Sequence, residues 1–151
     1  MRSTWTNKTF VVACTHLKSK PPHEARRVVQ IKQLIEHLVS MQGQEPEQHA
    51  KEPIVLTGDF NADVGNDVYN TASMNFDSAY LRCHGEEPEY TTCKVRKDGE
   101  ACHTIDYIFV SKSIQVIKCL SIPKRSELPT ERIPSWGYPS DHLSIGADLE
   151  L

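Results

Sequence analysis

Apolar positions along this chain repeat with two periods, one typical of strands and one typical of a helix with a single apolar face. Residues Lys8 to Cys14 are rich in β-branched and aromatic side chains, which predicts a strand that delivers Thr15-His16-Leu17 at its end. After Pro21-Pro22, the segment from Glu24 to Met41 carries apolar residues at helical spacing, namely Val28, Ile31, Leu34, Ile35 and Leu38. The pattern therefore predicts one long helix that packs on a sheet.

The rest of the chain predicts further short strands and one short helix. Ile54-Val55-Leu56 reads as a buried strand that ends in a turn at Gly58-Asp59-Phe60-Asn61, and Asp67 to Ser73 as a short helix. The other predicted strands are Tyr90 to Arg96, Thr104 to Ser111, Ile114 to Ile122 and Leu143 to Leu151. We expect the first two of these to form a hairpin around Lys97-Asp98-Gly99-Glu100, and prolines to hold the segment before Leu143 as a loop. The total is about six strands.

Length and charge narrow the class of protein. A chain of 151 residues fits one domain with a sizeable core. Its 17 basic and 20 acidic residues give a net charge of −3, so no basic excess indicates a nucleic-acid-binding protein. A local basic rim on an acidic site still allows a phosphorylated substrate.

The cysteines and the termini bear on the compartment. The five cysteines are odd in number and contain no C-x-x-C motif, which predicts free thiols in a reducing compartment. The N-terminus has no apolar segment of a secretion signal, and no stretch is long enough for a membrane span, so we expect a cytoplasmic protein without a membrane partner. A mitochondrial form would need an N-terminal extension. A zinc site at Cys83-His84 and Cys102-His103 is disfavoured, because adjacent ligands lack the usual spacing.

Polar clusters at the edges of apolar runs are the candidates for chemistry. Asp106 stands among Ile105, Tyr107 and Ile108, where an isolated carboxylate is costly unless it has a partner. His142 is the natural candidate, because a carboxylate on one imidazole nitrogen fixes the tautomer and leaves the other nitrogen to accept a proton. The alternative for His142 is a capping or core histidine.

A second cluster combines a carboxylate with an amide at a strand end. Asp59 can orient or deprotonate a water molecule, and Asn61 can donate to a phosphoryl oxygen. The alternative is that both residues only form an Asx turn. Among basic side chains, His16, Lys18, Lys20 and Arg96 are suited to a phosphate, although each taken singly fits a solvated surface charge.

In chain order, Thr15-His16-Leu17, Gly58-Asp59-Phe60-Asn61, Ile105-Asp106-Tyr107-Ile108 and Ser140-Asp141-His142 resemble the C-terminal half of the endonuclease/exonuclease/phosphatase superfamily. The resemblance implies an α/β (α+β) fold: half of a four-layer α/β sandwich, mostly antiparallel, with one long flanking helix. Residues 1–151 would then form a partial domain. It also implies a Mg²⁺-dependent hydrolase related to the CCR4-type deadenylases.

A narrower resemblance is to the superfamily members that remove the 2′-phosphate of NADP(H). Thr15-His16-Leu17-Lys18 and Tyr90-Thr91-Thr92-Cys93-Lys94-Val95-Arg96 carry it. It implies that Asp59 positions the attacking water, that Asn61 and His16 bind the phosphate and that Asp106 pairs with His142. It further implies that Lys18, Lys20 and Arg96 contact substrate phosphates, and that Asp141 helps to hold the metal ion.

The same resemblance implies that the superfamily's first half, with its principal metal-binding Glu, has no counterpart here. We therefore expect weak Mg²⁺ binding and one sheet with an uncovered apolar face, through which the chain could self-associate. Three functions stay open. They are NADP(H) 2′-phosphate hydrolysis, 3′-exonuclease action on poly(A) RNA, and a non-catalytic module that only binds phosphate.

Overall fold

The computed structural model describes residues 1–3, 7–41, 52–97, 99–128 and 133–151. Its central feature is a four-stranded sheet with the order β1-β2-β6-β3. The bounds of these strands are β1 Val11–His16, β2 Ile54–Asp59, β3 Asp77–Ser78 and β6 Asp106–Val110. Strand β1 is parallel to β2, whereas β2 and β3 are both antiparallel to β6. This mixed, mostly antiparallel sheet agrees with the predicted fold class.

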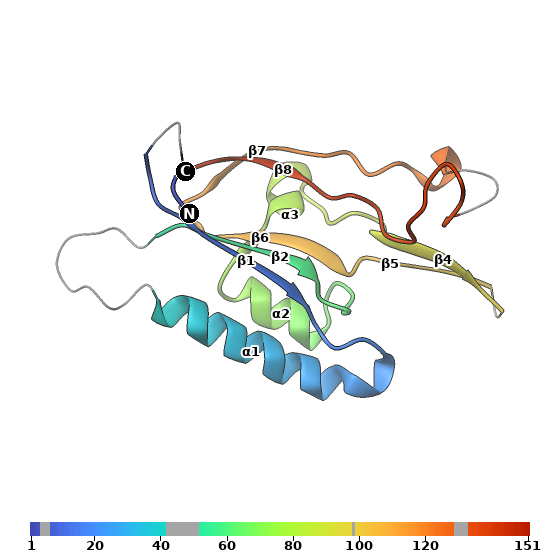
Figure 1. Cartoon of the computed structure of the whole chain (residues 1–151), viewed down its shortest axis with the longest axis horizontal. Helices are drawn as coiled ribbons and strands as arrows, with labels where there is room; N and C mark the ends of the chain where they lie inside the picture. Colours follow the sequence, from blue (N-terminus) through green and yellow to red (C-terminus); the bar gives the residue numbers. More distant parts are fainter. Residues whose placement is uncertain (4–6, 42–51, 98, 129–132) are drawn as a thin grey trace.

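Two helices cover one face of this sheet (Figure 1). They are α1 Glu24–Ser40 and α2 Asp67–Ser73, close to the helices predicted from the sequence. Helix α1 buries Ile31, Ile35 and Leu38, which recur at helical spacing. They share a core with the side chains that alternate toward this face from the strands, such as Leu56 and Phe109.

The opposite face of the sheet is covered by α3 Ala79–His84 and by the pair β7 Gln115–Cys119 and β8 Ala147–Glu150 (Figure 1). Val55, Ile108 and Val110 project to this side and are buried in a second core. The expectation of an uncovered apolar face is therefore wrong for β2 and β6, which this layer shields, whereas Val12 and Cys14 of β1 stay exposed. Self-association stays a prediction.

A hairpin of β4 Thr92–Arg96 and β5 Gly99–His103 extends beside this layered body (Figure 1). The sequence predicted the wrong partner for the first of these strands. Strand β4 pairs with β5, whereas Asp106–Val110 joins the main sheet beside β2. The described residues thus contain eight strands in three sheets rather than about six strands chiefly in one. Two 3-10 turns complete the elements, at Pro21–His23 and Arg125–Glu127.

Two predictions from composition have different outcomes. Cys93 and Cys102 face each other across the hairpin and form a disulfide, so the prediction of five free thiols is wrong for this pair. Cys14, Cys83 and Cys119 are free. Among the described residues, no helix has the length and apolarity needed to cross a membrane. The polar connection predicted after Met41 lies largely outside the described residues.

Candidate active site

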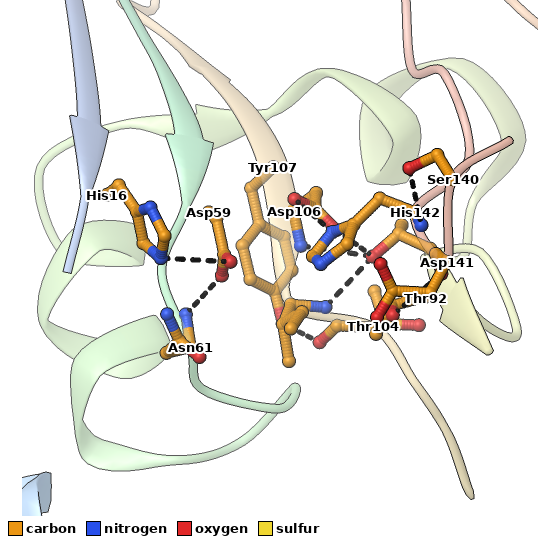
Figure 2. A network of polar contacts seen from close by, with 12 residues as sticks. His16, Asp59, Asn61, Thr92, Thr104, Asp106, Tyr107, Ser140, Asp141 and His142 are labelled. Atoms are coloured by element: carbon orange, nitrogen blue, oxygen red, sulfur yellow. Dashed lines mark hydrogen bonds and ion pairs between the residues drawn. The ribbon is translucent and has the colours of Figure 1, made fainter. Parts of the chain in front are cut away.

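Strand register brings three of the predicted site residues into one row. His16 is the last residue of β1, Asp59 is the last residue of β2, and Asp106 is the first residue of β6. His16 pairs with Asp59, and Asp59 pairs with Asp106 across the neighbouring strands. The three polar side chains therefore gather at one end of the sheet, where apolar packing stops (Figure 2).

His142 approaches this row from the loop before β8. Its backbone forms an isolated bridge with Thr92, and its Nδ1 lies 3.1 and 3.0 Å from the two carboxylate oxygens of Asp106. The predicted contact between Asp106 and His142 is confirmed. With Nδ1–H donating to the carboxylate, Nε2 is left as the proton acceptor or phosphate contact. The His142 side chain is about one-third exposed, so a substrate can reach it.

Thr91 fixes the orientation of Asp106, and sequence reasoning missed it. Thr91 is fully buried, and its Oγ1 donates to Asp106 Oδ2 at 2.7 Å. The same oxygen accepts from the backbone N–H groups of Ile105 and Asp106, both at 3.0 Å. Thr91 lies within the strand predicted over Tyr90 to Arg96, where threonine is common, so its residue type alone did not distinguish it.

Asp59 and Asn61 form a compact turn at the end of β2. The Asn61 backbone N–H donates to Asp59 Oδ1 at 2.7 Å, which is the Asx turn left open as an alternative. The Asn61 side-chain amide donates to the Leu17 carbonyl at 3.0 Å, and Asn61 has a left-handed φ of 50°. His16 Nε2 lies 3.4 Å from Asp59 Oδ2. The Asx turn is therefore compatible with a functional site, because it places the Asp59 carboxylate next to His16.

Burial raises the pKa of Asp59 above its ordinary value of 3.8. The hydrogen bond from the Asn61 backbone opposes this effect, the negative charge of Asp106 adds to it, and the two histidines oppose it. A carboxylate with a raised pKa accepts a proton more readily than a solvated one. Asp59 is thus suited to take a proton from a water molecule.

The donor set also fits a divalent cation. Ligand atoms of Asp59, Asp106 and His142 all lie within 4.8 Å of one another. Mg²⁺ is usually held by one or two carboxylates together with waters and substrate phosphate. Asp59 and Asp106 supply those two carboxylates, and their cross-strand pairing leaves two like charges that a cation would neutralise.

Asp141, the predicted metal ligand, makes different contacts. Its carboxylate accepts from Lys94 Nζ at 3.0 Å, and this hydrogen bond lowers the pKa of Asp141 against the effect of burial. Its backbone carbonyl accepts from Cys93 N–H and Thr92 Oγ1 at 2.9 and 2.8 Å. These contacts tie Asp141 to β4, and its role at a metal ion stays a prediction.

The predicted basic residues divide into two places. Lys18 and Lys20 lie on the loop after β1. Their backbone carbonyls accept hydrogen bonds from Nη1 of the buried Arg27 at 3.1 and 2.9 Å. Helix α1 therefore fixes this loop beside the end of β1. Arg96 ends β4 at the far end of the hairpin, about 13 Å along the strand from Thr92 at 3.3 Å per residue. Its side chain lies outside the described part of the structure, and its substrate contact stays a prediction.

Comparisons with known proteins agree with this arrangement. The sequence pattern of the Endonuclease/Exonuclease/phosphatase family matches residues 4–142. Nocturnin of Xenopus laevis is 41% identical over 97% of this chain, and human nocturnin is 39% identical over 95% of it. The solved catalytic domain of human nocturnin with bound sulfate covers 99% of this chain at 33% identity, with a TM-score of 0.74.

The match covers only part of each relative. The chain spans 38% of the Xenopus laevis protein, 34% of the human protein and 50% of the solved human domain. Its strands and helices nevertheless follow that domain along nearly their whole length. This chain belongs to the endonuclease/exonuclease/phosphatase family of metal-dependent hydrolases and is nocturnin-like within it.

Proposed function

We propose that this chain contributes the catalytic carboxylates and histidine of a Mg²⁺-dependent hydrolase that removes the 2′-phosphate of NADP(H). The observation that carries the proposal is the convergence of Asp59, Asp106 and His142 at the strand ends, in a chain similar to nocturnin over nearly its whole length. Two carboxylates and an oriented imidazole provide a proton acceptor and a contact for a phosphate. Such a set fits attack of water on a phosphoester.

Each residue has a separate task in this proposal. Asp59, whose pKa is raised by burial, orients the attacking water and accepts its proton. Asp106, itself held by Thr91, keeps the His142 ring in place, and His142 Nε2 contacts the phosphate. His16 and the Asn61 amide complete the phosphate contacts at the end of β1 and β2. Asp59 and Asp106 would hold a Mg²⁺ ion, which would supply positive charge to stabilise the phosphoryl oxygens.

The choice of NADP(H) over poly(A) rests on weaker observations. The net charge of −3 provides no overall basic excess to attract an RNA backbone. The basic residues closest in sequence to His16 are Lys18 and Lys20, on a short loop fixed by Arg27, which suits a small anionic substrate. A further relative, rat 2′,5′-phosphodiesterase 12, is named for a 2′,5′-phosphodiester substrate and is 26% identical over 98% of this chain.

A paired substrate assay tests the proposal. The chain with Mg²⁺ is incubated with NADPH and, separately, with oligoadenylate, and release of phosphate and of AMP is measured. We expect phosphate from NADPH and no AMP, with the phosphate lost in Asp59→Asn. AMP from oligoadenylate without phosphate from NADPH would replace the proposal with a deadenylase.

If the chain releases neither product, the remaining function is phosphate binding without catalysis. If the folded chain releases neither product but NADP⁺ raises its melting temperature, the chain is a phosphate-binding module that does not catalyse hydrolysis. A His37→Ala variant provides the matched control, because His37 is exposed on helix α1 away from the strand ends. It should behave as the unchanged chain in both assays.

A further inference from the structure

A second group of metal-ligating side chains lies between helix α3 and strand β7. Cys83 and His84 are the last two residues of α3, and Cys119 is the last residue of β7. The two sulfur atoms and an imidazole nitrogen all lie within 4.8 Å of one another. Cys119 is buried, Cys83 is half-buried and His84 is exposed. None of them belongs to the strand-end site.

The fold holds these two elements together at both ends. Tyr80 on α3 donates from its hydroxyl to the Leu120 carbonyl at 2.8 Å, next to Cys119. Arg82 Nη1 donates to the Ile114 carbonyl at 2.7 Å, just before β7 begins. Gly85, with a left-handed φ of 80°, ends the helix directly after His84. These contacts hold α3 against the two ends of β7, so the fold keeps the backbone of Cys83 and His84 near that of Cys119.

We propose that Cys83, His84 and Cys119 form a zinc site with two thiolates, one imidazole and a fourth position open to water. Zn²⁺ prefers four ligands of this kind, with Zn–S near 2.3 Å and Zn–N near 2.0 Å. Tetrahedral geometry at those lengths places ligand atoms about 3.8 Å apart or less. The observed limit of 4.8 Å needs only about an ångström of side-chain movement, which the half-buried Cys83 and exposed His84 allow.

The surroundings favour a cation over an anion. A pocket of about 290 Å³ adjoins the cluster at His84, and its charged lining consists of three glutamates and one lysine, namely Glu86, Glu87, Glu89 and Lys124. Binding releases one proton from each sulfur, leaves two thiolates on Zn²⁺ and involves no change of oxidation state.

The spacing of residues in the sequence did not predict this zinc site. Cys83-His84 lacks the spacing of a zinc motif, and its assumed partner was Cys102-His103. The structure instead places Cys102 in a disulfide on the hairpin and supplies Cys119 from β7. The missing ligand thus comes from a strand that packs against α3, which no local spacing reveals.

Cobalt substitution tests the proposal, because thiolate-bound Co²⁺ has a charge-transfer absorption that carboxylate-bound Co²⁺ lacks. The chain, kept in a thiol-free reductant, is titrated with Co²⁺ and then with Zn²⁺, and the melting temperature of each variant is recorded. We expect the absorption to saturate at one equivalent of Co²⁺ and to disappear when Zn²⁺ is added. Cys83→Ser and Cys119→Ser should abolish it, and His84→Ala should weaken Zn²⁺ binding about tenfold or more.

Three matched variants make the result specific. Cys14→Ser removes an exposed free thiol, Cys93→Ser removes the hairpin pair, and Asp59→Asn removes a carboxylate of the strand-end site. All three should keep the absorption. A folded wild-type chain without the absorption, or its loss in any of the three, would overturn the proposal. If Cys119→Ser does not fold, Cys83→Ser and His84→Ala decide, since their side chains are more exposed.

Discussion

At the scale of single residues, the environment of a charge was more informative than its type. The contact between Asp106 and His142 could be predicted because a lone carboxylate in an apolar run needs a partner. Thr91 could not be predicted, because its importance comes from three hydrogen bonds that exist only once β6 lies beside the start of β4. Neutral positioning residues of this kind leave no trace in charge or periodicity.

Thr91→Val is the sharpest test of this positioning role. Valine keeps the shape but leaves two buried N–H groups and one carboxylate oxygen without the hydroxyl, which should cost about 1–3 kcal/mol of unfolding free energy. Phosphate release should fall more strongly in kcat than in KM, because Asp106 no longer holds His142. Urea unfolding and steady-state kinetics measure the two effects.

Two further variants separate this role from a general loss of packing. Thr91→Ser keeps the hydroxyl and should restore most of the activity. Thr71→Val removes a hydroxyl that only bonds a carbonyl within helix α2 and should leave activity unchanged. Equal activity of Thr91→Val and wild type would show that Thr91 does not position Asp106.

The raised pKa of Asp59 predicts how stability depends on pH. Since the folded pKa lies above the ordinary value of 3.8, the folded chain binds more protons between these values than the unfolded chain. The contribution of Asp59 to stability is therefore fully present below pH 3.8 and is lost as pH rises through the folded pKa. Asp59→Asn should remove this loss, as measured by urea unfolding across pH in EDTA.

Asp141 supplies a control of opposite sign. Lys94 lowers its pKa, so its contribution is present above pH 3.8 and is lost as pH falls through the folded value. Asp141→Asn should therefore flatten the acid side of the stability profile instead. Identical pH profiles for wild type and Asp59→Asn would contradict the burial of the Asp59 carboxylate described here.

At the scale of elements, hydrophobic periodicity predicted the helices and strands that bury a continuous apolar face. Helix α1 and strand β2 appear where the sequence placed them, because each buries a continuous apolar face. The pairing of β4 with β5 was missed, since Gly99–His103 is mostly polar and its partner is set by the hairpin register. Helix α3 has only six residues, too few for a helical repeat, although Ser78 caps its start and Gly85 its end.

The close approach of β1 and β2 depends on Gly58. Its φ is +139°, and a Cβ built there would overlap the Thr15 carbonyl oxygen in the paired strand. Gly58→Ala should therefore cost about 3 kcal/mol or more and displace Asp59 from His16. Denaturant unfolding measures this cost.

Gly65→Ala is the matched control. Its φ of +81° is also left-handed, but nothing lies within 4 Å of the added Cβ. It should cost only about 1 kcal/mol, the strain of the backbone alone. Equal losses in the two variants would show that steric overlap with Thr15 is not what requires glycine at position 58.

At the scale of the whole molecule, the layers explain why the polar site lies where it does. Helices α1 and α2 cover one face of the main sheet, and α3 with β7 and β8 covers the other except along β1, so the polar side chains gather at the strand ends (Figure 1). The sequence-based expectation of a bare face was wrong for most of the sheet, because β7 and β8 lie outside the main sheet and form a covering layer that leaves only Val12 and Cys14 of the described β1 residues on this face exposed apart from the strand end. The strand ends then carry the site, and the α3–β7 contact carries the candidate zinc ligands.

The most direct test of the central claim is phosphate release from NADPH with Mg²⁺ by the folded chain and by His142→Ala, at equal melting temperature. We expect measurable phosphate release by the unchanged chain and the same release by His37→Ala. His142→Ala should lose about 100-fold or more of this activity, which is the usual effect of removing a positioned acid or base. Release that is the same in His142→Ala, or none from the folded chain, would contradict the assignment of the strand-end cluster as a working phosphatase site.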